Sequence, residues 1–126
     1  MFKRFAALAA LVVVCSLAMA QDAEWTKTEL GSFRVERFWE ETLGDYTWAT
    51  TIVTYKNTTK KTFTKNVTLR ATIYDSQKKM VDTTTRSFFV FEYGPIKPDF
   101  EGTLKFEMGC AKGKAKSVSV RIDNAR

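Results

Sequence analysis

The stretch 66–75 alternates apolar and polar side chains, and this pattern limits the fold more than any other feature of the chain. Because successive side chains of a β-strand point to opposite faces of a sheet, a period of two predicts a strand with one buried face and one solvent-facing face. The apolar face carries Val67, Leu69, Ala71 and Ile73. The opposite face carries Thr68, Arg70, Thr72 and Tyr74. Such a strand is typical of an antiparallel sheet packed on a core.

The same alternation recurs along the chain, and no segment after residue 20 has the period of an amphipathic helix. Further strands are predicted over residues 30–39, 46–56, 80–91, 104–108 and 118–122. This pattern predicts an all-β domain, an immunoglobulin- or fibronectin-like β-sandwich of six to seven antiparallel strands. A small barrel is the alternative. The predicted core contains at least one tryptophan together with Val53, Val67, Leu69, Ala71, Ile73, Leu104, Phe106, Val118, Val120 and Ile122.

A secretory signal peptide is predicted over residues 1–20. Lys3 and Arg4 form its positive start, residues 5–17 are apolar, and the Ala-Met-Ala sequence at 18–20 supplies the small residues of a cleavage site. Cleavage after Ala20 leaves one domain, residues 21–126, without a transmembrane segment, which indicates an exported protein, periplasmic or extracellular. The apolar run is shorter than the roughly 20 residues of a spanning helix, so a membrane anchor is the weaker alternative. Lipid attachment at Cys15 is another alternative.

The positive net charge of the chain indicates which kinds of molecule it could bind. The chain has 20 Lys and Arg against 14 Asp and Glu, a formal net charge of +6. Loss of Lys3 and Arg4 with the signal peptide lowers this charge to about +4. A basic surface outside the cytoplasm favours an envelope protein or an anionic surface polymer as the partner, and it argues against nucleic acid.

Three short segments form a pattern that occurs in a known family. They are Asn57-Thr58-Thr59 after a predicted strand, the segment 67–75 (VTLRATIYD), and Ile96-Lys97-Pro98 ahead of Leu104-Lys105-Phe106. Over about residues 55–108 the chain therefore resembles the FxLYD-type bacterial envelope domain. The resemblance implies a small sandwich in an exported or anchored protein, and it implies no reaction and no site residues.

The residue types of common catalytic sites are scarce. The chain has no histidine, which removes the commonest general base and metal ligand. Once Cys15 is removed, Cys110 is the lone cysteine, so no disulfide is predicted. No phosphate-binding loop is present. The chain is therefore predicted not to be an enzyme and to hold no metal or cofactor. A carboxylate-based hydrolase is the enzymatic alternative, with candidates Glu40, Glu41, Asp45, Asp99 and Glu101.

The sequence thus predicts a non-enzymatic exported interaction domain that binds a protein or an anionic envelope polymer. Aromatic side chains on an exposed face bind sugars or proteins, which makes Trp39 and Tyr93 candidate binding residues. The basic connection 110–116 adds Lys112, Lys114 and Lys116. The alternative is a small secreted inhibitor or accessory subunit. It would use the loop 91–100, which Pro95 and Pro98 stiffen.

Overall fold

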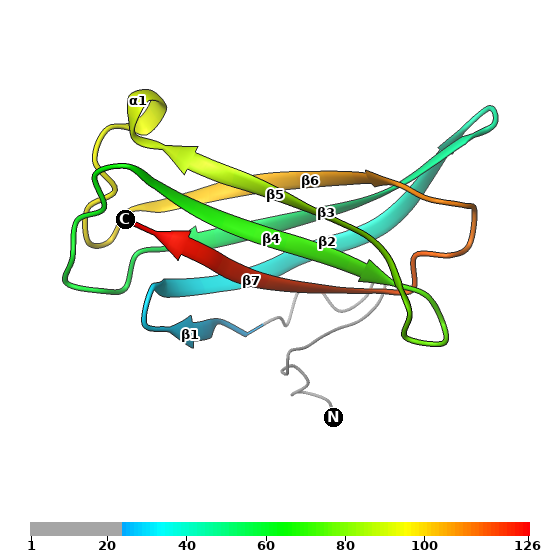
Figure 1. Ribbon diagram of the computed structural model, residues 1–126, viewed down its shortest axis with the longest axis horizontal. Helices are drawn as coiled ribbons and strands as arrows, with labels where there is room; N and C mark the ends of the chain where they lie inside the picture. Colours follow the sequence, from blue (N-terminus) through cyan, green and yellow to red (C-terminus); the bar gives the residue numbers. More distant parts are fainter. Residues whose placement is uncertain (1–23) are drawn as a thin grey trace.

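The computed structural model describes residues 24–126, and Figure 1 shows their arrangement. The predicted signal peptide, with its cleavage site after Ala20, lies outside the described residues. The strands are β1 (Thr26–Thr28), β2 (Gly31–Leu43), β3 (Tyr46–Lys56), β4 (Asn66–Tyr74), β5 (Met80–Phe89), β6 (Glu101–Gly109) and β7 (Ser117–Ala125). One short helix, α1 (Val90–Tyr93), follows β5.

Two antiparallel sheets face each other across the core. The four-stranded sheet has the order β1-β2-β3-β6, and the three-stranded sheet has the order β5-β4-β7. Four strands packed on three is also the arrangement of constant-type immunoglobulin domains. The structure therefore confirms the predicted all-β sandwich of antiparallel strands. The helix α1 lies at one end of the sandwich, and the β2–β3 hairpin projects from the opposite end (Figure 1).

The alternation that predicted the strands also predicts which side chains are interior. On β4, the side chains of Val67, Leu69, Ala71 and Ile73 are fully buried, whereas the intervening side chains are half-buried on the outer face. All predicted core residues are buried except Ile122, which is half-buried and packs against the core. Ile122 lies beside a register shift between β4 and β7, where Asp123 is the extra residue of a bulge. Bulges bend a strand locally, which explains the looser packing there.

The prediction of a tryptophan in the core is wrong. Trp25, Trp39 and Trp48 are all half-buried, and the core cluster contains none of them. Trp48 alternates with the core residues of β3 and so lies on the outer face of the sheet. Trp39 is turned outward because a register shift between Val35 and Arg37 changes the parity of β2. The largest fully buried side chains are instead Tyr55, Phe88 and Phe106.

Two elements differ from the predicted strands. The short strand β1 was not predicted; it pairs with the start of β2. The predicted strand 80–91 ends at Phe89, and the next residues form α1. The apolar run 88–91 was expected to be central or covered by a neighbour. In the structure β5 is an edge strand. Phe88 lies opposite Val67 on the core face and is buried, whereas Phe89 lies on the outer face and is exposed.

Candidate functional site

Four aromatic rings form a cluster inside the end of the sandwich from which α1 projects. Tyr55 and Phe88 are fully buried, with ring centroids 5.8 Å apart. Phe100 packs edge-on against Phe88 at 5.3 Å. Tyr93, the last residue of α1, packs edge-on against Phe88 at 5.4 Å and Phe100 at 5.9 Å. Edge-to-face packing at these distances is favourable, so the cluster fastens α1 to the core.

Gly102 of β6 makes this cluster possible. A Cβ atom at Gly102 would lie 2.6 Å from the Phe88 ring and 3.1 Å from the Phe100 ring. Real Cβ atoms do not approach aromatic carbons that closely, so any larger residue displaces a ring. The backbone of β6 therefore provides the space in which Phe88 lies.

Burial ends one residue after Phe88. Phe89 is 37 % exposed, Phe91 is 86 % exposed and Tyr93 is 46 % exposed. We call these three residues the aromatic tip. The rings of Phe89 and Phe91 stack with centroids 5.1 Å apart and planes 22° apart. Exposed aromatic rings that lie together on a protruding element are typical of an interaction site.

The aromatic tip stands on an ordered backbone. On one side the Val90 N–H donates to the Lys65 carbonyl at 3.2 Å. On the other side the Gly94 N–H donates to the Val90 carbonyl at 2.7 Å. Gly94 has φ 76° and ψ 179°, a conformation that only glycine adopts readily. Just beyond it, Phe63 and Ile96 exchange two backbone hydrogen bonds of 3.0 and 2.9 Å. Both ends of the tip are thus anchored.

Asn57 fixes the segment that follows the tip. Its side chain is fully buried, and Nδ2 donates to the carbonyls of Lys61 and Ile96 at 2.9 and 3.0 Å. Its backbone N–H donates to the Phe100 carbonyl, and its carbonyl accepts from the Asp99 N–H, both at 2.8 Å. One residue therefore joins the β3–β4 connection to the β5–β6 connection.

Basic residues lie close to the base of the tip in the backbone. The N–H groups of Lys65 and Asn66 donate to the Arg126 carbonyl at 2.7 and 3.1 Å, so Arg126 lies next to the residue that anchors Val90. Lys97 follows the bridge formed by Ile96. Lys65, Lys97 and Arg126 are exposed. None of the ion pairs found within residues 24–126 uses them.

The predicted binding residues Tyr93 and Trp39 do not share a surface. Tyr93 belongs to the aromatic tip. Trp39 lies on the outer face of the four-stranded sheet, opposite Thr50 of β3. The Arg37 guanidinium carbon lies 4.3 Å from the centroid of the Trp39 ring. Because a stacked cation covers one face of the indole, Trp39 offers less free surface than the tip does.

The predicted basic connection between β6 and β7 lies at the end of β6 farthest from α1 (Figure 1). Glu40 of β2 holds this connection in place. The Gly113 N–H donates to Glu40 Oε1 at 2.9 Å, and the Ala115 N–H donates to Glu40 Oε2 at 2.8 Å. This arrangement leaves three side chains exposed: Lys112, Lys114 and Lys116. They form a surface separate from the tip.

Glu40 also determines the chemistry of Cys110. The Cys110 Sγ lies 3.9 Å from Glu40 Oε2. Burial, with the charge of Glu40 and this hydrogen bond in addition, raises the pKa of the Cys110 thiol. Because the thiolate is the nucleophile, a raised pKa makes Cys110 less reactive.

The carboxylate candidates Glu40 and Glu41 of the hydrolase alternative are consecutive residues of β2. Their side chains therefore point to opposite faces of the sheet and do not form a pair.

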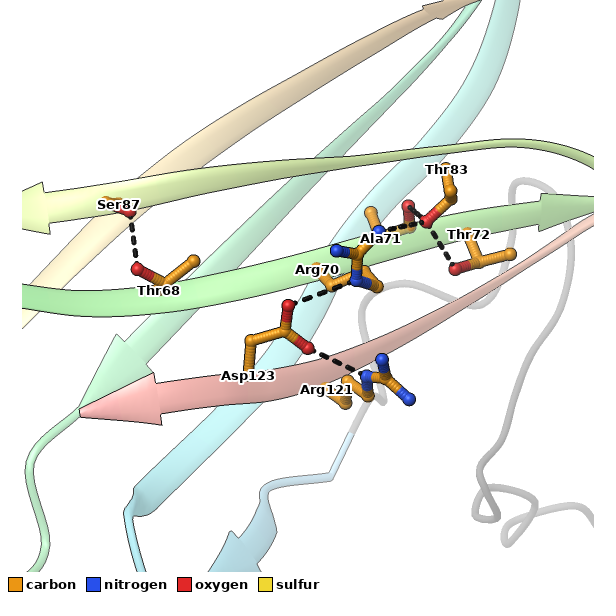
Figure 2. A network of polar contacts seen from close by, with 8 residues as sticks. All are labelled: Thr68, Arg70, Ala71, Thr72, Thr83, Ser87, Arg121 and Asp123. Atoms are coloured by element: carbon orange, nitrogen blue, oxygen red, sulfur yellow. Dashed lines mark hydrogen bonds and ion pairs between the residues drawn. The ribbon is translucent and has the colours of Figure 1, made fainter.

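The outer face of β5-β4-β7 carries a polar network (Figure 2). Asp123 accepts from Arg70 Nε at 3.1 Å and from Arg121 Nε at 2.9 Å. Arg70 also donates to the Thr83 hydroxyl at 3.1 Å. Two more hydroxyl pairs continue the network, Thr72 with Thr83 at 2.9 Å and Thr68 with Ser87 at 2.7 Å. Because these groups bond to one another, this face has fewer free polar groups for a partner than its composition suggests.

Phe89 and Phe91 were not predicted as binding residues, although Phe91 begins the candidate loop 91–100. The signal was present as four apolar residues in a row, 88–91, separated by two residues from the Gly94-Pro95 pair. The run was interpreted as a buried strand because continuous apolar runs are common in such strands. The residue at which β5 ends and the face on which Phe89 lies depend on the tertiary fold, which the local sequence does not reveal.

Within residues 24–126, no group of three His, Cys, Asp or Glu side chains is placed to hold a metal ion. None of the helical residues in this part of the chain belongs to a helix long and apolar enough to cross a membrane.

Comparison with known proteins adds little to this geometry. No family model matches the chain, and no curated protein matches it. Among solved structures, the crystal structure of a DUF1425 family member from Shewanella sp. pv-4 is similar, with a TM-score of 0.43 and 11% identity. The match covers 76% of this chain and 81% of that chain. At this TM-score the likeness carries no argument about function.

Proposed function

We propose that this chain is a non-enzymatic exported interaction domain that binds a component of the cell envelope through its aromatic tip. The observation that carries the proposal is the 86 % exposure of Phe91 on a helix that is itself fastened to the core. Exposed phenylalanine on an ordered support is costly to keep in water, and covering it is favourable by about 2 kcal/mol.

The ordered support also favours binding. A flexible loop loses conformational entropy when a partner holds it, whereas a preorganised one loses less. Backbone hydrogen bonds anchor both ends of the tip, at Val90 and at Ile96. The tip therefore presents Phe91 in nearly its bound position before the partner arrives.

Export rests on the sequence alone. The signal peptide at residues 1–20 and the FxLYD-type resemblance both favour a periplasmic or extracellular protein. The absence of histidine from the chain supports a binding role over a catalytic one. Lys112, Lys114 and Lys116 are exposed on an ordered connection and are the candidate contacts for an anionic envelope polymer.

A second candidate function is a small inhibitor or accessory subunit that uses the loop with Pro95 and Pro98. The rigidity of this loop favours it. The Phe100 N–H donates to the Lys97 carbonyl at 3.0 Å, and Asn57 bonds to both ends of the segment 96–100. A stoichiometric complex with one protein that tolerates loss of Phe91 and requires Pro95 and Pro98 would favour this candidate.

The test immobilises residues 21–126 on a column, as the wild-type protein, as Phe91→Ser and as Leu43→Ser. Each column is then loaded with an extract of envelope components, and the retained components are compared. We expect Phe91→Ser to abolish most of the retention of the component that the wild-type protein captures. Leu43→Ser is the matched control, because Leu43 is 75 % exposed in the hairpin at the opposite end of the molecule. Equal retention by all three forms would refute the aromatic tip as the binding surface.

A further inference from the structure

The aromatic tip combines two properties that a lipid surface recognises. It protrudes from one end of the sandwich with Phe91 as its most exposed large side chain (Figure 1). Exposed basic residues lie near its base, and none of the ion pairs within residues 24–126 includes Lys65, Lys97 or Arg126. On the basis of the proposed function, we infer that the component bound by the tip is an anionic lipid bilayer, into whose interface Phe91 inserts.

Shape favours a bilayer over a protein groove. The exposed rings lie on a convex turn of α1 and the last residue of β5. Phe91 is the most exposed of the three rings, and Phe89 and Tyr93, which flank it in the sequence, are less exposed. Amphipathic elements with an apolar apex and basic residues around it are typical of proteins that lie in the interface of a membrane. Tyrosine is enriched at this depth because its ring is apolar and its hydroxyl is polar.

Charge favours anionic headgroups. The connections at this end, residues 57–66 and 89–100, together with Arg126, carry more bases than acids. The bases are Lys60, Lys61, Lys65, Lys97 and Arg126, and the acids are Glu92 and Asp99. All five bases are exposed, and no ion pair within residues 24–126 engages them. Cations near the negative surface of a bilayer each add to the attraction, and salt screens that attraction.

The helix carries one unfavourable group, the exposed carboxylate of Glu92 beside Phe91. Glu92 is the third of the four residues of α1 and directly follows Phe91. Because an anionic surface repels it, removal of this charge should strengthen binding to anionic vesicles. This sign is the opposite of the one expected if Glu92 contacted a basic protein.

The experiment measures partition of the mature wild-type protein onto vesicles of equal phosphatidylglycerol and phosphatidylcholine, and onto vesicles of phosphatidylcholine alone. We expect the partition coefficient on the anionic vesicles to be at least tenfold larger than that on vesicles of phosphatidylcholine alone. We expect Phe91→Ser to lower the partition coefficient at least tenfold, which corresponds to loss of most of one buried phenylalanine. Lys65→Gln with Lys97→Gln should lower it severalfold and flatten its salt dependence, whereas Glu92→Gln should raise it.

Leu43→Ser is the matched control and should bind as the wild-type protein does, because its exposed side chain lies in the hairpin at the far end. Thermal unfolding of every variant checks that the fold is retained. Failure of the wild-type protein to bind anionic vesicles overturns the inference, as does unchanged binding by Phe91→Ser. If either result occurs while retention of an envelope protein still depends on Phe91, the proposed function stands and its partner is a protein.

Discussion

At the scale of single residues, Asn57 connects more of the surroundings of the aromatic tip than any other side chain described above. We expect Asn57→Ala to lower the free energy of unfolding by about 2 to 4 kcal/mol, because it removes the two hydrogen bonds that Nδ2 donates to the Lys61 and Ile96 carbonyls and the two that Oδ1 accepts from Thr59. Urea denaturation measures the change. Asn66→Ala is the control, since the Asn66 side-chain oxygen is buried without a hydrogen-bond partner in the described structure. An equal loss in both variants would contradict this role of Asn57.

Tyr55 makes stability depend on pH in the alkaline range. Burial raises the pKa of its hydroxyl from 10.0 to about 12, and the hydroxyl donates to the Leu30 carbonyl at 2.9 Å, which requires its proton. Between these two values the unfolded chain releases this proton while the folded chain keeps it. The contribution of Tyr55 to stability is therefore constant below pH 10 and falls by up to roughly 3 kcal/mol as the pH rises toward 12.

Urea denaturation of the wild-type protein and of Tyr55→Phe, at several pH values between 9 and 11, measures this effect. Phenylalanine cannot titrate, so the difference in stability between the two proteins should shrink as the pH rises. Parallel curves over this range would show that the Tyr55 hydroxyl has no raised pKa in the folded state.

At the scale of elements, the β6–β7 connection owes its order to one carboxylate on another strand. Glu40→Ala removes the acceptor of the Gly113 and Ala115 N–H groups and the negative charge beside Cys110. We expect alkylation of Cys110 in the mature protein at pH 8 to become severalfold faster, because the thiol pKa falls and its surroundings loosen. Glu41→Ala, on the opposite face of β2, should leave the rate unchanged. A larger effect from Glu41→Ala would refute this assignment.

The elements that the sequence predicted well are those in which local alternation and tertiary position agree. β3 begins and ends where the pattern predicts, at Tyr46 and Lys56, and β4 differs only at its last residue. Both strands are central in their sheets, so each has one face on the core and neighbours on both edges. Under these conditions a period of two is sufficient to place a strand and its buried side chains.

The elements that the sequence predicted poorly depend on features without a local signal. A bulge in β2 reverses the face of Trp39, and Phe89 lies on the outer face of the three-stranded sheet, where it is exposed. The strand β5 stops at Phe89, before the predicted end, and the chain continues as α1, which Gly94 ends with φ 76° and ψ 179°. For the candidate site, Tyr93 was predicted because aromatic side chains on an exposed face are typical binding residues. Phe91 was placed only within the loop 91–100, because its exposure depends on where the strand stops.

At the scale of the whole molecule, the two sheets share one hydrophobic cluster, which includes Val53 and Phe106 of the first sheet and Leu69 and Ile73 of the second. Neither sheet can bury its apolar face alone, so the two should unfold together. The tryptophans provide a way to observe this. Trp39 and Trp48 belong to the four-stranded sheet, and Trp25 immediately precedes β1 of the same sheet. Tryptophan fluorescence therefore reports on the sheet that does not contain Leu69.

We expect Leu69→Ala to lower the free energy of unfolding by about 2 to 5 kcal/mol, because the fully buried side chain leaves a cavity between the sheets. The urea midpoint followed by tryptophan fluorescence should fall as far as the midpoint followed by far-ultraviolet circular dichroism. Thr68→Ala is the neighbouring control: its hydroxyl pairs with Ser87 on the outer face, so the loss should be about 1 kcal/mol. If the fluorescence midpoint of Leu69→Ala stays at the wild-type value while the dichroism midpoint falls, the sheets unfold separately. The aromatic tip lies at the end of β5 and in α1, and its support includes Phe100, directly before β6, and Gly102, near the start of β6, so it would then lose its ordered base before the rest of the domain unfolds.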